Sequence, residues 1–114
     1  MSAVVLLAHA QQILTKPRAD GLAPRMAAFL ARQALEEIIV ARCESLGAAV
    51  PWANARSRLI VLRALDTADA ADSASRAWSG LSSACHVHAF ELQPSASEVR
   101  HLCAVVASLL PASP

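Results

Sequence analysis

Apolar residues recur at every third or fourth position along most of this chain, and this helical spacing constrains its fold more than any other feature. Four breaks interrupt the pattern, at residues 16–24, 47–51, 65–67 and 92–95. Between them we predict five helices: about 3–15, 24–46, 52–65, 66 through His88, and 95–109. Alanine occurs 26 times, glycine three times and tyrosine never, a composition that favours close-packed helices over a β-sandwich or barrel. We therefore predict an all-α fold, an up-and-down bundle of four to five helices, in one domain over residues 1–114.

Local signals place several residues within these helices. Ser95-Ala96-Ser97-Glu98 is a capping box directly after Pro94, and Asp66 is the predicted N-cap of the fourth helix. On the second helix, Arg32 and Glu36 have the spacing of an i,i+4 ion pair. The predicted buried stripe of the first helix consists of Val4, Leu7, Ala8 and Leu14.

Charge, cysteine content and hydropathy limit the setting in which we expect the protein to work. The net charge of +1 gives no compositional reason to expect nucleic acid or an anionic membrane. Three cysteines without paired spacing, Cys43, Cys85 and Cys103, favour reduced thiols over a disulfide framework. No stretch approaches the roughly 18 apolar residues of a membrane span. We expect a soluble, cytoplasmic protein with no membrane contact.

The densest polar cluster is Cys85-His86-Val87-His88, which is followed by Glu91. On a continuous helix, Cys85 and His88 share a face, as do His88 and Glu91, and a metal site would also need His101 or Cys103. No motif of known ligand geometry is present, so we expect no metal and no cofactor, with Cys85 in the core. His86 lies off the apolar stripe, where a histidine can be a general acid or base or simply an exposed polar residue.

Arginine outnumbers lysine nine to one, and the arginine fork suits phosphate and carboxylate recognition. A GC-rich genome produces the same bias without any function. Arg56, Arg58 and Arg63 form the most concentrated basic surface, which could contact RNA phosphate or the acidic run of Asp66, Asp69 and Asp72. Trp78 falls in the predicted core stripe of the fourth helix, where packing is a better explanation than base stacking.

Two segments resemble the HEPN superfamily of small helical domains. The first is Ala31-Arg32-Gln33-Ala34-Leu35-Glu36 near the start of the long second helix, and the second is residues 77–94, AWSGLSSACHVHAFELQP. The second segment is similar to actinobacterial proteins of this type, and the resemblance covers about residues 23–110. It implies an up-and-down bundle, usually dimeric, found in toxin–antitoxin and other defence systems.

Many HEPN domains are metal-independent ribonucleases whose active site pairs an arginine and a histidine as Arg-x(4–6)-His. Here His86 and His88 are the candidate histidines, but residues 79–83 contain no arginine. Arg76 lies ten residues before His86, about 15 Å along a helix, so these side chains do not meet within one helix. Arg32, Arg56 or Arg63 would have to supply the missing cation from another helix or protomer.

Three functions follow from these observations. The first, which fits best because the paired motif is absent, is a HEPN-like interaction module that is homodimeric or binds a protein partner. The second is a divergent ribonuclease, in which His86 or His88 is the acid or base, an arginine stabilises the phosphate and RNA is the partner. The third is a small-ligand site between helices, lined by Cys85, His88, Trp78 and an arginine.

Overall fold

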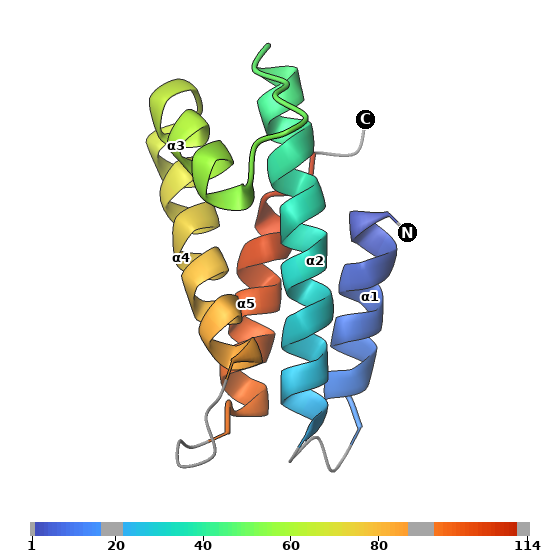
Figure 1. The fold of residues 1–114 in the computed structure, drawn as a ribbon. Coiled ribbons are helices and arrows are strands. Elements are labelled where there is room, and N and C mark those ends of the chain that lie inside the picture. Colours follow the sequence, from blue (N-terminus) through green and yellow to red (C-terminus); the bar gives the residue numbers. More distant parts are fainter. Residues whose placement is uncertain (1, 17–21, 87–92, 112–114) are drawn as a thin grey trace.

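A computed structural model describes residues 2–16, 22–86 and 93–111 of the chain. Within these ranges there are five α-helices and no strand. The helices are α1 (Ala3–Leu14), α2 (Leu22–Ser45), α3 (Ala55–Leu65), α4 (Ala68–Cys85) and α5 (Ala96–Ser108). The prediction of an all-α fold with five helices is therefore confirmed, and Figure 1 shows the arrangement.

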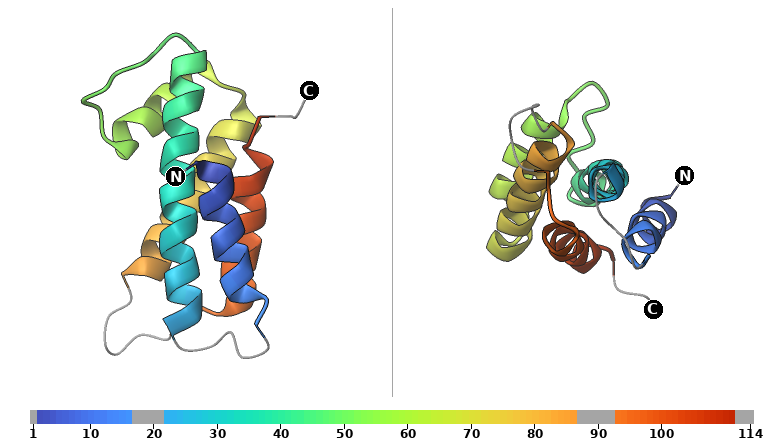
Figure 2. Two further views of the ribbon diagram at one scale, coloured as in Figure 1. Left: turned by 90° about the vertical axis from the view of Figure 1, so that its right-hand side faces the viewer. Right: turned by 90° about the horizontal axis from the view of Figure 1, so that it is seen from below.

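The helices α1, α2, α4 and α5 form an up-and-down bundle, because each runs opposite in direction to the one before it (Figure 1). The long helix α2 contacts all four of the others. The short helix α3 packs against α2 and α4 at the end of the bundle where α2 finishes (Figures 1 and 2). None of the helices in the described ranges is long and apolar enough to cross a membrane.

Alanine is the main reason why the helices approach one another closely. The inner face of α2 carries four fully buried alanines, Ala27, Ala28, Ala31 and Ala34, and α4 adds further ones at the same spacing. Larger buried side chains fill the space between the helices, among them Leu14, Leu35, Leu81 and Val106. The predicted stripe of the first helix is half wrong, because Val4 and Ala8 are exposed and the buried residues of α1 are Leu6, Leu7, Ala10 and Leu14.

Side-chain caps fix where four of the helices begin. The hydroxyl of Ser95 accepts a hydrogen bond from the backbone N–H of Glu98, which confirms the predicted helix start. Ser2 and Asn54 cap α1 and α3 in the same way. The predicted N-cap at Asp66 is wrong, because Thr67 caps α4 and Asp66 is the C-cap of α3. The carboxylate of Asp66 is engaged by Arg42 on α2 instead.

Candidate functional site

Three large apolar side chains lie on the outside of the N-terminal half of α2. Leu22, Met26 and Phe29 are 65 %, 57 % and 52 % exposed, respectively. Their spacing of four and three residues places them on one face of the helix, opposite the alanines that enter the core. We call these three residues the α2 stripe. Contiguous exposed apolar side chains on a small protein mark sites where another molecule binds.

The α2 stripe borders a hollow beside the C-terminal end of α4. This hollow has a volume of about 390 Å³ and is lined by the three stripe residues together with Arg25 and Cys85. The charged Arg25 side chain is partly buried at its edge. The surface is thus an apolar depression with a cation on one side.

Arg25 links α2 to the last turn of α4. Its Nε donates a hydrogen bond to the backbone carbonyl of Cys85, with a donor–acceptor distance of 3.2 Å. That carbonyl has no partner within the helix because α4 ends at Cys85. The next residue, His86, is the exposed C-cap, and its N–H donates to the carbonyls of Ser82 and Ser83. Sequence reasoning overlooked Arg25, although its seven-residue spacing from Arg32 places both arginines on the side of α2 that faces α4.

Arg32 packs on Trp78 of α4. The guanidinium carbon lies 4.3 Å from the centre of the tryptophan ring, and Nε donates to the hydroxyl of Ser82 at 3.0 Å. Trp78 is partly buried and packs against the core, as its position in the predicted stripe indicated. The predicted pair between Arg32 and Glu36 is wrong, because the two ion pairs of the described residues involve neither side chain.

Cys85 has the environment of a packing residue. Burial raises the pKa of its thiol, and the nearby Arg32 and Arg25 offset only part of that effect. The helix α4 ends at Cys85, and the predicted face shared by Cys85 and His88 extends beyond the described residues. His88 and Glu91 themselves lie outside the described residues. Within the described ranges, no group of three or more His, Cys, Asp or Glu side chains could hold a metal ion.

The remaining predicted arginines are spread over other parts of the bundle. Arg56, Arg58 and Arg63 belong to α3, at the opposite end of the bundle from His86 (Figure 1). Arg63 pairs with Asp72 at 3.3 Å, so one of these arginines contacts the acidic run, as the sequence allowed. Arg58 donates a hydrogen bond to the carbonyl of Val50. Arg56 is exposed. Arg76 is exposed in the middle of α4, ten residues before His86, as the sequence implied.

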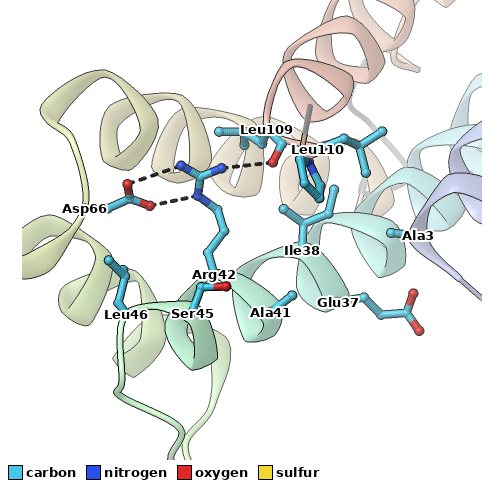
Figure 3. A pocket seen from close by; sticks show the side chains of 11 residues that line it. Ala3, Glu37, Ile38, Ala41, Arg42, Ser45, Leu46, Asp66, Leu109 and Leu110 are labelled. Atoms are coloured by element: carbon cyan, nitrogen blue, oxygen red, sulfur yellow. Dashed lines mark hydrogen bonds and ion pairs between the residues drawn. The ribbon is translucent and has the colours of Figure 1, made fainter. Parts of the chain in front are cut away.

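A second cavity lies at the other end of the bundle, beyond the start of the short helix α1. It has a volume of about 470 Å³, and Figure 3 shows its lining. Ile38, Ala41, Leu109 and other apolar residues form most of its wall. Neither Cys85 nor Trp78, which were named for the predicted ligand site, lines it.

Arg42 and Asp66 form a charged pair in the wall of this second cavity. Arg42 donates through Nε and Nη2 to the two oxygens of Asp66, at 2.7 and 3.2 Å, and through Nη1 to the carbonyl of Leu109. The hydrogen bond from Arg42 lowers the pKa of Asp66, against the opposing effect of burial. This pair joins α2 to the α3–α4 junction and to the C-cap of α5 (Figure 3). The charged groups of Arg42 and Asp66 are therefore hydrogen-bonded within the fold.

Comparison with known protein families, curated proteins and solved structures finds no match to this chain.

Proposed function

We propose that this chain is a HEPN-like helical interaction module that works by associating through the α2 stripe, as a homodimer or with a protein partner. The observation that carries the proposal is the exposure of Leu22, Met26 and Phe29 on one helix face. The HEPN resemblance over residues 23–110 favours the same function and implies a defence or toxin–antitoxin setting. An interaction module also needs no arginine–histidine pair within one helix.

The α2 stripe is a better contact surface than the cavity beside Arg42. Apolar side chains that are more than half exposed gain most from being covered, at about 25 cal/mol per Å² of apolar area removed from water. The charged groups in the second cavity already satisfy one another. An apolar centre with a cation at its edge, as the stripe has with Arg25, is the usual composition of a protein–protein contact.

Sedimentation velocity over a wide range of protein concentration tests this proposal. We expect the wild type to associate as concentration rises, and the Met26→Ser/Phe29→Ser variant to stay monomeric. Ile60→Ser is the matched control, since Ile60 on α3 is 67 % exposed and lies outside the stripe. A monomeric wild type at all concentrations would refute self-association through the stripe, as would equal loss of association in the control.

One observation favours a second function, a metal-independent ribonuclease. Arg25 is bonded to the peptide that immediately precedes His86, so a cation from α2 is held at the residue next to a candidate acid or base. In such an enzyme the histidine would transfer a proton and the arginine would stabilise charge on the phosphate.

Inducible expression distinguishes the ribonuclease from the module. The ribonuclease predicts growth arrest and fragmented total RNA for the wild type, both relieved by His86→Ala/His88→Ala and by Arg25→Ala. The module predicts normal growth and intact RNA for all three proteins. Arrest that persists in the histidine variant would exclude these histidines as the catalytic groups.

A further inference from the structure

The outer face of α2 carries opposite charges on the same side of the stripe. Arg25 and Glu36 are eleven residues apart, which is about three helical turns and roughly 16 Å along the axis, so their azimuths differ by only about 20°. Glu36 is exposed, and neither ion pair of the described residues involves it. The Nε of Arg25 donates to the carbonyl of Cys85, and its two terminal nitrogens make no hydrogen bond to a described residue.

This arrangement is complementary to itself. A two-fold axis perpendicular to α2, at the level midway between residues 25 and 36, brings a second α2 antiparallel to the first. Under this rotation, the side of α2 that carries Arg25 and Glu36 lies next to the same side of the partner's α2. Arg25 of one copy therefore meets Glu36 of the other, and this contact occurs twice. Such reciprocal contacts are the defining property of an isologous interface.

The apolar residues follow the same symmetry. Phe29 lies within about half a helical turn of the midpoint, so the two phenylalanines come together next to the axis. Met26 of one copy reaches the level between Gln33 and Glu37 of the other. At that level the surface has an open hollow of about 420 Å³, lined by Leu6, Gln33, Glu36 and Glu37. The side chain of Met26 therefore faces a depression on the partner that lies at the same level along the helix axis.

We propose that the partner of the α2 stripe is a second copy of this chain. The two α2 helices pack antiparallel, with Arg25 paired to the partner's Glu36 and Met26 seated in the hollow beside the partner's Gln33. This inference rests on the proposed function, which names the surface, and it adds the partner and the pairing. The specific prediction is that the charge at position 25 of one subunit must be opposite to the charge at position 36 of the other.

Charge reversal tests the pairing by sedimentation velocity. In an R25E homodimer two carboxylates would face each other at each of the two contacts, and in an E36R homodimer two guanidinium groups would do so. We expect each variant alone to associate about tenfold more weakly than the wild type, because two attractive contacts become repulsive. In a mixed dimer of R25E with E36R, both contacts join a carboxylate of the first chain to a guanidinium group of the second, so mixing the two variants should restore association.

The double variant R25E/E36R provides a second rescue, within a single chain. Both of its contacts again join a carboxylate to a guanidinium group, with the two charges exchanged between positions 25 and 36. We expect it to self-associate about as strongly as the wild type, which would also show that losing the Arg25–Cys85 hydrogen bond does not unfold the chain. An equimolar mixture of the double variant with wild-type protein should form few mixed dimers, because each contact in such a dimer joins like charges.

The outcomes separate this inference from the proposed function. Rescue in R25E/E36R, with weak association of each single variant, supports antiparallel pairing of two copies. In another outcome, the wild type dimerises and Met26→Ser/Phe29→Ser disrupts the dimer, but the double variant shows no rescue. This result overturns the pairing of Arg25 with Glu36 and leaves association through the α2 stripe supported. A wild type that is monomeric at every concentration overturns both.

Discussion

Arg42 Nε lies 2.7 Å from Asp66 Oδ2, and this pair joins the end of α2 to the junction of α3 and α4. The Asp66 side chain is 9 % exposed and that of Arg42 29 %. The same guanidinium donates to the carbonyl of Leu109, the C-cap of α5. One arginine therefore ties three parts of the bundle together at the end that the short helix α1 leaves uncovered.

Replacing Asp66 by asparagine should destabilise the fold by about 1–3 kcal/mol, because Arg42 loses a charged, two-point acceptor in a partly buried position. Urea unfolding monitored by circular dichroism measures the change. Asp72→Asn is the matched control, since Asp72 pairs with Arg63 at the exposed surface, where such pairs contribute less than about 1 kcal/mol. Equal effects of the two substitutions would contradict the structural role of the Arg42–Asp66 pair.

The same pair predicts a pH dependence of stability. The pKa of Asp66 is lowered in the folded state, mainly by the hydrogen bond from Arg42. Its stabilisation is therefore present above the ordinary aspartate pKa of about 3.9 and is lost as the pH falls through the lower folded-state value. The difference in unfolding free energy between wild type and Asp66→Asn should be constant near neutral pH and shrink below about pH 4. A difference that grows on acidification would have the wrong sign.

Gly47 ends α2 with a left-handed backbone, at φ +77°. The N–H of Ala48 donates to the carbonyl of Cys43, and that of Gly47 to the carbonyl of Glu44, a pattern that requires this conformation. Gly47→Ala should cost about 1–2 kcal/mol, because a Cβ disfavours positive φ even where nothing else is in contact. Gly47→Asn should cost less, since asparagine tolerates this region better. Thermal melting of the three proteins measures the order.

The Arg32–Trp78 contact can be followed by fluorescence. Trp52 is 86 % exposed, so a Trp52→Phe background leaves Trp78 as the single reporter. Arg32→Met should shift the emission of Trp78 and cost about 1 kcal/mol in stability, because it removes the cation over the ring and the bond to Ser82. Arg56→Met is the control, and an unchanged emission in Arg32→Met would contradict the stacked geometry.

Local sequence signals predicted the helices well because each signal acts within one helical turn. Ser95 caps α5 through Glu98, three residues on, and Gly47 lies just past the end of α2. Asp66 was misassigned because Thr67 has the same capping chemistry one position later, while the charge of Asp66 is engaged by Arg42 on another helix. The buried face of α1 was misassigned because residues 3–8 are apolar without a break, so their spacing does not single out one face of the helix.

The candidate site was harder to predict because it depends on which helices become neighbours. The Arg32–Trp78 contact and the Arg25–Cys85 bond join residues 46 and 60 positions apart, and no local pattern records such distances. The α2 stripe could have been recognised in the sequence, as Leu22, Met26 and Phe29 have helical spacing. What the sequence could not show is that none of the described helices covers this face.

Hydroxyl-radical footprinting of the wild type at low and high protein concentration tests the role of the α2 stripe most directly. Met26 and Phe29 are exposed in the single chain, so oxidation of both should fall as concentration rises, while that of the exposed Trp52 stays constant. Oxidation of Met26 and Phe29 that is independent of concentration, or a fall at Trp52 alone, would contradict association through the α2 stripe.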